Sequence, residues 1–423
     1  MKAGTVEKFL DKESWRSYGA VSTPSEIVDL MIELSGVKSW RGLEILEPGA
    51  GFCGFLRKIK KRHPENRFTG VEINREIFRA AAAMRAEFNL VLADFLLWDA
   101  PGKYELIIGN PPYGIIGDKS HYPIHIVKES KKAYKTIFQT WFGKYNIYGA
   151  FIEKSVSLLK PGGCLAFIVP ATFMVLDDFK LLRKFLAGSG RTKIYYLGPK
   201  TFPGKNVSAA IIIFTRGAQG IELYEIDKSR HITKHYEKEK YGGGLIRFES
   251  ADTDAFERGK AKLGELFEIH FAARSPEIKK HPLTSTRPGK GLVPVLTGRN
   301  LHKGWIDYGR CFSGFYFPLK SVGELRRFYA TKHIVIGHTK GTRLEAAIDD
   351  RGYPWREDIH LIPKTKNIAL KPVLEYLNRA ELEWYLRSLY KEISPHLTIT
   401  QLKLLPIPDL GKGAGNICSG FAS

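Results

Sequence analysis

The first 170 residues alternate short apolar runs with helix-like segments, and this alternation restricts the fold more than any other feature of the sequence. Each run has the length of a strand and is bounded by Gly, Pro or charged residues. Alternating β and α segments at this spacing predict an open, mostly parallel sheet with helices on both faces. Strands are expected at Leu43–Leu46, Arg67–Ile73, Leu90–Ala93, Tyr104–Ile108 and Cys164–Val169, and helices at Phe55–His63, Arg75–Phe88 and Ala150–Leu159.

The rest of the chain is less regular. Tyr195–Gly198 and Ser208–Thr215 predict two late strands, for which a hairpin at one sheet edge is one arrangement. Residues 216–244 are polar without a clear period and end in three glycines, which is typical of a flexible boundary. A chain of 423 residues has room for two domains. We expect them at residues 1–240 and 245–423, the second being a less regular α/β domain.

The composition restricts the partners. Lys and Arg number 65 against 44 Asp and Glu, a formal net charge of +21, which favours a polyanionic partner such as nucleic acid or an anionic membrane. The first residues contain no apolar signal-peptide core, and no run reaches the roughly 18–20 apolar residues of a membrane span. The four cysteines lack zinc-site spacing and are too few for a disulfide scaffold. We therefore expect a cytoplasmic protein without structural zinc.

A Gly-rich turn follows the first predicted strand, in the segment Glu47-Pro-Gly-Ala-Gly-Phe-Cys-Gly54. Its glycines match the nucleotide-binding spacing G-x-G-x-x-G, although a turn that is merely tightly packed has the same pattern. Glu47, Glu72 and Asp94 come at the ends of three successive predicted strands. Acids are unfavourable beside a pyrophosphate and favourable beside a sulfonium or an amino group. They favour S-adenosylmethionine over NAD or FAD, while each alone could instead cap a helix.

A more specific motif, Asn110-Pro-Pro-Tyr113, follows the fourth predicted strand. The prolines fix the backbone and offer carbonyl groups without N–H donors. An Asn carboxamide oxygen and the Pro111 carbonyl can accept both hydrogens of an exocyclic amine, which directs the nitrogen lone pair towards an electrophile. Tyr113 offers an aromatic face on which a base can stack. The motif alone suits adenine N6 and cytosine N4 equally.

The order of these motifs resembles the gamma-class amino methyltransferases that act on DNA, and more narrowly the TaqI-like adenine-N6 DNA methyltransferases. The resemblance runs from about residue 20 to about residue 408. It implies a Rossmann-like, S-adenosylmethionine-dependent methyltransferase domain at 1–240 and a mixed α/β DNA-recognition domain at 245–423. Matching segments include Ala93–Trp98, Gly109–Gly114, Tyr122–His125, Tyr148–Phe151, Leu158–Gly163, Phe271–Glu277, Gly291–Leu301, His338–Arg343 and Pro395–Thr398.

The resemblance also implies roles for single residues. Asn110 and Pro111 would bind the target amine, and Tyr113 and Phe202 would stack on a flipped adenine. The assignment of Phe202 rests on Phe-Pro-x-Lys-x-Val-Ser, since the segment 200–205 has an extra residue relative to the family pattern. The expected cofactor contacts are Val21, Thr23, Glu47, Gly49, Glu72 (to the ribose), Ile73, Asp94 (to the adenine amino group), Phe95, Pro112 and Phe151. The expected DNA contacts are Lys205, Arg274, Arg299, Lys340, Arg343 and Pro395, the last of which would fill the space that the flipped base vacates.

The resemblance thus implies methylation of adenine N6 in double-stranded DNA, with TCGA as the expected target sequence, by a monomeric prokaryotic enzyme without a metal. A separate restriction endonuclease would be its functional, not physical, partner. Two rival activities, methylation of RNA guanine or of protein glutamine, use the same Asn-Pro-Pro-Tyr motif but generally lack a C-terminal domain of this size. A DNA-binding module without catalysis is a further alternative, against which the intact motif argues.

Overall fold

The computed structural model describes residues 23–84, 88–117, 123–124, 127–199, 201, 207–338, 343–391 and 393–408. The chain divides into two compact units, Met1–Arg247 (unit 1) and Phe248–Ser423 (unit 2), and each is described by itself. The division falls shortly after the glycine run that ends at Gly244.

Unit 1 is built on one large mixed β-sheet. Within the described residues the sheet has nine strands, in the order β11-β10-β8-β9-β7-β4-β1-β2-β3. The neighbours from β3 to β7 are parallel, whereas β9 lies antiparallel between β7 and β8. The predicted α/β class is therefore confirmed. The strands are β1 (Glu44–Pro48), β2 (Arg67–Glu72), β3 (Asn89–Leu92), β4 (Tyr104–Gly109), β7 (Leu159–Pro170), β8 (Gly190–Gly198), β9 (Ala209–Arg216), β10 (Ile221–Ile226) and β11 (Ile232–Lys238).

The late strands differ from the sequence-based expectation. β8 and β9 do form an antiparallel hairpin, but β9 lies inside the sheet and β10 and β11 extend it beyond β8, so the expected edge position is wrong. The sequence conceals β10 because the buried Glu222 interrupts its apolar residues. Arg191 Nε donates to Glu222 Oε1 at 2.8 Å, so the buried carboxylate has a charged partner on the neighbouring strand.

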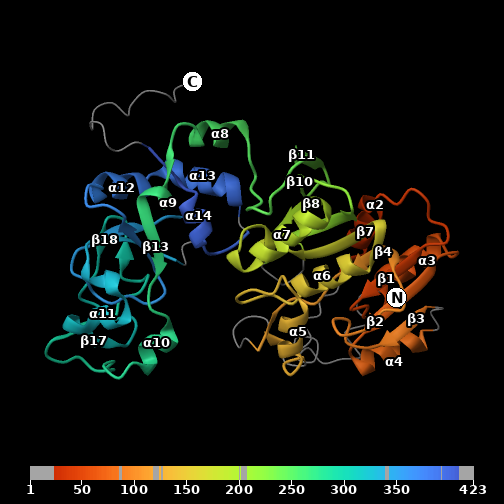
Figure 1. Ribbon diagram of the computed structural model, residues 1–423, viewed down its shortest axis with the longest axis horizontal. Coiled ribbons are helices and arrows are strands. Elements are labelled where there is room, and N and C mark those ends of the chain that lie inside the picture. Colours follow the sequence, from red (N-terminus) through yellow and green to blue (C-terminus); the bar gives the residue numbers. More distant parts are fainter. Residues whose placement is uncertain are drawn as a thin grey trace. The chain divides into compact units, whose positions relative to one another are not determined.

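The helices cover the sheet on both faces. Strand order reverses at β1, and right-handed crossovers then place the helices that follow β1 and β2 on the face opposite to those that follow β4 and β7. Figure 1 shows β1, β4 and β7 side by side within unit 1. The carboxyl ends of β1 and β4 flank the reversal point, which is where open α/β sheets bind ligands. The unit 1 helices are α2 (Ser25–Leu34), α3 (Gly54–Arg62), α4 (Arg75–Ala83), α5 (Lys131–Ile137), α6 (Tyr148–Leu158) and α7 (Lys180–Ser189), with 3-10 turns η2 (Ala171–Met174) and η3 (Asp177–Phe179) and the short pair β5 (Ile115–Ile116) and β6 (Pro123–Ile124).

Unit 2 is smaller and less regular, as the scattered Pro and Gly residues predict. Its described part contains a four-stranded antiparallel sheet, β13-β20-β18-β19, and three two-stranded pairs, β12-β21, β14-β17 and β15-β16. The strands are β12 (Ala261–Lys262), β13 (Phe267–Phe271), β14 (Leu292–Pro294), β15 (Leu301–His302), β16 (Trp305–Ile306), β17 (Tyr316–Pro318), β18 (His333–Ile336), β19 (Ala346–Asp349), β20 (Ile359–Pro363) and β21 (Pro406–Ile407). The helices are α8 (Ala251–Glu257), α9 (Leu263–Leu266), α10 (Ser275–Lys280), α11 (Val322–Leu325), α12 (Leu370–Leu377), α13 (Ala380–Tyr390) and α14 (Ile399–Lys403), with 3-10 turns η4 (Leu319–Ser321) and η5 (Arg327–Ala330).

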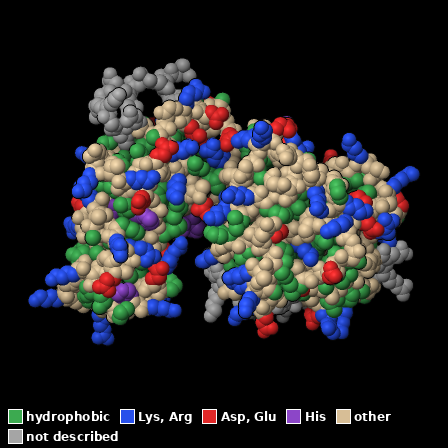
Figure 2. All heavy atoms as spheres, viewed as in Figure 1, with side chains coloured by type: hydrophobic (Ala, Val, Ile, Leu, Met, Phe, Trp, Pro, Cys, Tyr) green, Lys and Arg blue, Asp and Glu red, His purple; other side chains and the backbone are tan. Residues whose placement is uncertain are grey.

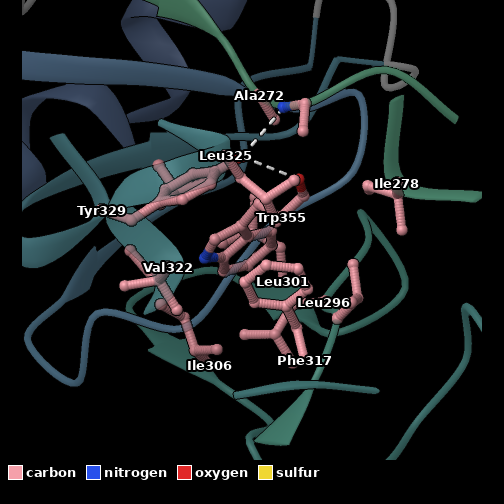
Figure 3. Packing of buried hydrophobic residues seen from close by; sticks show 14 residues of the cluster. Ala272, Ile278, Leu296, Leu301, Ile306, Phe317, Val322, Leu325, Tyr329 and Trp355 are labelled. Carbon is pink, nitrogen blue, oxygen red and sulfur yellow. Dashed lines mark hydrogen bonds between the residues drawn. The ribbon is translucent and has the colours of Figure 1, made fainter. Parts of the chain in front are cut away.

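The core of unit 2 surrounds a fully buried tryptophan, Trp355 (Figure 3). Its indole Nε1 donates to Asp349 Oδ2 at 2.7 Å, so the ring is buried without losing its hydrogen bond. The Tyr329 hydroxyl donates to the Trp355 carbonyl at 2.8 Å and accepts from the Ala273 amide at 2.8 Å. These bonds fix the loop before β20 and the segment after β13 against one another.

Candidate active site

The Gly-rich turn between β1 and α3 faces the segment that follows β4. Gly49 and Gly51 adopt φ values of +63° and +54°, which L-residues with side chains rarely adopt. A Cβ atom built on Gly49 would lie 3.6 Å from Pro112 Cδ and 3.7 Å from Phe151 Cε1. The turn, the Asn-Pro-Pro-Tyr segment and helix α6 therefore meet at one edge of the sheet.

Glu47 is the first of the three acids at this edge. It is buried, and its two carboxylate oxygens accept from the backbone amides of Phe55 at 3.4 Å and Leu56 at 3.1 Å, in the first turn of α3. Burial raises the pKa of Glu47 to about 8, although these two amides act in the opposite direction. A neighbouring cation would stabilise the ionised form of this carboxyl group.

Glu72, at the end of β2, connects two parts of the site. Its Oε2 atom accepts from the Gly51 amide at 2.8 Å, and its Oε1 atom accepts from the Asn74 amide at 2.8 Å. Burial raises the pKa of this carboxyl group as well. The next residue, Ile73, is an exposed large apolar side chain, with 37% of its surface accessible. An acid and an apolar surface thus lie side by side at the end of β2.

Asp94, after β3, has partners for both carboxylate oxygens. Oδ1 accepts from the Leu96 amide at 3.0 Å within a turn over residues 95–97, so Asp94 has a local backbone partner but caps no helix. Oδ2 accepts from the hydroxyl of Tyr134 at 2.5 Å, a contact that the sequence did not suggest. The following residue, Phe95, is buried, with its ring 5.1 Å from that of Phe151.

The Asn-Pro-Pro-Tyr segment directly follows β4. Asn110 Nδ2 donates to the Thr23 hydroxyl at 2.9 Å, which orients the carboxamide with Oδ1 directed away from Thr23. Pro111 is buried and Pro112 is partly exposed. Tyr113 is 6% exposed, and its hydroxyl donates to the Ile168 carbonyl on β7 at 2.9 Å. The tyrosine ring is therefore held at its hydroxyl end by the central sheet.

In unit 2, two of the expected DNA contacts lie near one another. The exposed Arg274 places its guanidinium 4.4 Å from the Phe271 ring centre, and Phe271 meets His338 edge-on at 5.1 Å. His338 in turn stacks on His396 at 4.6 Å. Pro395, adjacent to His396 in the chain, is exposed. Burial lowers the pKa of His338 to about 4, so its ring is neutral near pH 7.

The other two described candidates are separate. Arg299 is exposed, with its guanidinium 4.5 Å from the Phe312 ring centre. Arg343 lies 3.7 Å from Glu383 Oε1, an acid that Arg387 also approaches at 3.9 Å. In Figure 2, Lys and Arg side chains are spread over the visible faces of both units, with Asp and Glu among them.

Comparisons with known proteins agree with this geometry. Residues 43–202 match the Eco57I restriction-modification methylase family, and residues 293–407 match the TaqI-like C-terminal specificity domain. A type II methyltransferase of Thermus thermophilus, M.TthHB8I, is 47% identical over 399 residues, which is 93% of this chain and 91% of that protein. The chain belongs to the type II restriction–modification methyltransferases.

More distant relatives support the same family. The type II methyltransferase M.CvrRI of Paramecium bursaria Chlorella virus XZ-6E is 34% identical over 71% of this methyltransferase and 73% of its own length. The solved structure of the DrdV–DNA complex superposes on 84% of this chain, which corresponds to 50% of the DrdV chain, with a TM-score of 0.51. At 15% sequence identity this match shows a similar fold alone. The expected methyltransferase fold with a C-terminal recognition domain is confirmed.

The structure of the methyltransferase brings most of the unit 1 candidates to one sheet edge. Those at the carboxyl ends of β1 to β4, or in contact with these ends, are Thr23, Glu47, Gly49, Glu72, Ile73, Asp94, Phe95, Asn110, Pro111, Pro112, Tyr113 and Phe151. Four further candidates lie outside the described residues: Val21, Phe202, Lys205 and Lys340. In the described part of the chain, no helix is long and apolar enough to cross a membrane, and no group of three or more His, Cys, Asp or Glu could hold a metal ion.

Sequence reasoning missed an aromatic cluster beside this site. Its rings follow one another at centroid distances between 4.9 and 6.3 Å, from Tyr134 on α5 to Tyr113. The density of aromatic residues between positions 134 and 151 is the one signal that could have revealed it. The members, in order of contact, are Tyr134, Trp141, Tyr145, Phe179, Tyr148 and Tyr113.

Proposed function

We propose that this methyltransferase transfers a methyl group from S-adenosylmethionine to N6 of an adenine flipped out of double-stranded DNA, within TCGA. The observation that carries the proposal is the approach of the Asn-Pro-Pro-Tyr segment to the Gly-rich turn, with Pro112 3.6 Å from the Cβ position of Gly49. A cofactor held by the turn and an amine held by Asn110 would then be neighbours. This is what an in-line transfer requires.

The residues at the sheet edge suit S-adenosylmethionine. Glu72 would accept from ribose hydroxyls, and the exposed Ile73 beside it would offer an apolar surface to an adenine ring. A neighbouring cation would stabilise the ionised form of the buried Glu47 carboxyl group, whereas a pyrophosphate would destabilise it. When bound, S-adenosylmethionine supplies a methyl group activated by its positive sulfonium. In this role Val21 and Thr23 belong to the segment that covers the cofactor.

The chain's own contribution to the transfer is to hold the amine. Asn110 Oδ1 and the Pro111 carbonyl accept its two hydrogens, so the nitrogen lone pair points at the methyl carbon. The N–C bond forms as the C–S bond breaks, and the methylated amine releases its extra proton to water. Thr23 orients the Asn110 carboxamide through their 2.9 Å hydrogen bond. Positioning and hydrogen bonding account for the rate, and no general base is needed.

Flipping the base has an energetic cost of a few kcal/mol, which protein contacts must offset. Stacking on Tyr113 and Phe202 contributes about 1–3 kcal/mol for each ring. Pro395 is exposed on unit 2, as a residue that enters the vacated space must be. In this proposal residues 1–240 bind the cofactor and carry catalysis, while residues 245–423 read the DNA sequence. The enzyme acts as a monomer without a metal in a prokaryotic cytoplasm, and it protects DNA from a cognate endonuclease.

The test uses tritiated S-adenosylmethionine with a TCGA duplex and with the same duplex carrying 2-aminopurine in place of the target adenine. Label in the first duplex alone, and a fluorescence rise when the second is bound, are the expected results. Label in other DNA but not at TCGA would overturn the target sequence. Label on cytosine would overturn the assignment of adenine as the target base. Label only in RNA or in a protein would overturn the DNA substrate.

Removing the exposed arginines of unit 2 is expected to weaken DNA binding to different extents. If the side chain reads a base, Arg274→Ala or Arg299→Ala should weaken binding of the specific duplex by about 1–3 kcal/mol. If the side chain contacts a phosphate, the slope of the logarithm of the binding constant against the logarithm of the salt concentration should become about one unit less steep. Arg343→Ala should have a smaller effect, because its contact with Glu383 must be broken first. Fluorescence anisotropy at several salt concentrations measures both quantities. Arg387→Ala, which removes the other cation near Glu383, is the matched control; an Arg343→Ala loss as large as that of Arg274→Ala would contradict this ranking.

A further inference from the structure

Tyr134 contacts the site from an element that no site motif includes. It lies on α5, is fully buried, and donates its hydroxyl hydrogen to Asp94 Oδ2 at 2.5 Å. The other carboxylate oxygen, Oδ1, accepts from the Leu96 amide at 3.0 Å. A carboxylate has about four acceptor positions, so two hydrogen bonds fix its plane and leave further acceptor capacity.

The position of Tyr134 is itself fixed by packing. Its ring centre lies 6.4 Å from that of Phe138 and 6.1 Å from that of Trp141. Burial, followed by the hydrogen bond to Asp94, raises the pKa of the Tyr134 hydroxyl, so this group remains a neutral donor. The Lys131 Nζ atom, on the same helix, donates to the Ile116 carbonyl at 2.5 Å. A rigid donor therefore meets one oxygen of a carboxylate at the cofactor edge.

We propose that Tyr134 is a positioning residue for cofactor recognition, which aims the Asp94 carboxylate at the amino group of the cofactor's adenine. This inference rests on the proposed function, in which Asp94 accepts from that amino group. A carboxylate rotates easily about its last side-chain bond when nothing holds it. When both of its oxygens are held, the carboxylate presents an acceptor in a fixed direction. Purines with a 6-amino group should therefore bind more tightly than purines without one. Tyr134 would thus determine how strongly the enzyme prefers adenine over other purines in its cofactor.

The test compares two ligands and two matched tyrosines. The ligands are S-adenosylhomocysteine and its analogue with hydrogen in place of the 6-amino group, and their Kd values are measured by calorimetry. The variants are Tyr134→Phe and Tyr145→Phe. Tyr145 is a buried tyrosine of the same aromatic cluster, but its hydroxyl pairs with Thr140 Oγ1 at 2.5 Å and not with Asp94.

The wild-type enzyme should prefer the 6-amino ligand by about 10- to 150-fold, as expected for one hydrogen bond to a charged acceptor. Tyr134→Phe should reduce this preference to a few-fold while leaving the affinity for the analogue nearly unchanged. Tyr145→Phe should keep the wild-type preference. In steady-state assays Tyr134→Phe should raise KM for S-adenosylmethionine with kcat nearly unchanged, because the group acts on binding rather than on the transition state.

If Tyr134→Phe lowered the affinity for both ligands by the same factor, the role of Tyr134 would be purely structural and the inference would be overturned. An unchanged preference would overturn it too. If the wild-type enzyme methylates DNA but binds both ligands equally, the inference fails and the proposed function stands. If it neither methylates DNA nor binds S-adenosylhomocysteine, the proposed function itself fails. If Tyr134→Phe folds poorly, Asp94→Asn serves as the second variant, because it keeps the size of the side chain. It should also lose the preference for the 6-amino ligand, and a variant that kept this preference would overturn the inference.

Discussion

Replacing Asn110 with Ala is expected to lower the rate of methyl transfer by at least about 10²–10³-fold, while cofactor and DNA affinities change little. Removing one hydrogen-bonding group that acts on the transition state has an effect of this size. Asn110 lies directly after β4, and its side chain is oriented by the 2.9 Å bond from Nδ2 to Thr23 Oγ1. The carboxamide oxygen is the group that would accept a hydrogen of the amine. Single-turnover transfer of tritiated methyl groups measures the rate, and anisotropy measures DNA binding.

A graded companion and a matched control make this result specific. Thr23→Val keeps the carboxamide but removes its orienting acceptor, so a loss of about 10-fold in rate is expected, corresponding to roughly 1.4 kcal/mol. Asn66→Ala removes a buried carboxamide outside the site, which accepts from the Leu43 amide and donates to the Trp40 carbonyl before β1. It should lower the melting temperature and leave kcat unchanged. If Asn110→Ala abolished DNA binding and not transfer in the bound state, the catalytic assignment would be wrong.

The sheet of unit 1 could be predicted from sequence where a strand is short, apolar and ended by Gly or an acid. Strands β1 to β4 have this form, and their carboxyl ends carry Glu47, Glu72 and the Asn-Pro-Pro-Tyr segment. Strand β10 was not predicted, because Glu222 is buried inside it. The interaction that makes this burial tolerable, with Arg191, joins residues 31 positions apart and leaves no local pattern.

The same limit applies to the site. Glu47, Gly49 and Asn110 belong to compact motifs, so their types and spacing reveal them. Tyr134 acts on Asp94 from 40 residues further along the chain, through a contact that exists only in the folded protein. The stacking of His338 on His396 is likewise a tertiary contact. Local motifs identify the groups that would touch a ligand, whereas the groups that hold them in place are visible only in the structure.

The aromatic cluster also relates the two halves of the proposed reaction. Tyr134 donates to Asp94 at the proposed cofactor edge, and Tyr113 would stack on the base; both rings belong to one series of contacts. Glu153, on α6, fixes the middle of this region by accepting from the amides of Gln139 and Thr140, each at 3.0 Å. A change that loosens the cluster should therefore disturb cofactor and base positions together, whereas Tyr134→Phe, which keeps the ring, should affect the cofactor alone.

The second large effect is expected from Glu47→Gln, and it has opposite signs for stability and for cofactor binding. The pKa of Glu47 is about 8 in the folded protein and near 4.5 when unperturbed. The folded state thus binds this proton more tightly, and the free energy of unfolding falls as the pH rises from about 4.5 to about 8. The side-chain amide of Gln carries no charge at any pH, so the variant should not show this pH-dependent loss of unfolding free energy. The variant should therefore gain melting temperature relative to the wild type as the pH rises from about 5 to about 8, by roughly 2–4 °C per kcal/mol gained. This gain adds to a pH-independent loss, because the Gln amide nitrogen cannot accept the second backbone N–H.

Cofactor binding should show the reverse. A cationic ligand favours the ionised carboxylate, so wild-type affinity for S-adenosylmethionine should rise with pH up to about 8, with release of a proton on binding. Glu47→Gln should abolish this slope and bind about 10- to 150-fold more weakly at pH 8, the range for a hydrogen bond to a charged group. Calorimetry between pH 6 and 9 in buffers of different ionisation enthalpy measures affinity and proton release together. Asp349→Asn is the control, because Asp349 is also buried and also accepts from two backbone amides, those of Arg351 and Gly352, yet lies in unit 2. A stability difference between Glu47→Gln and the wild type that does not change between pH 5 and pH 8 would show that the amides of α3 outweigh burial and keep Glu47 ionised without any ligand.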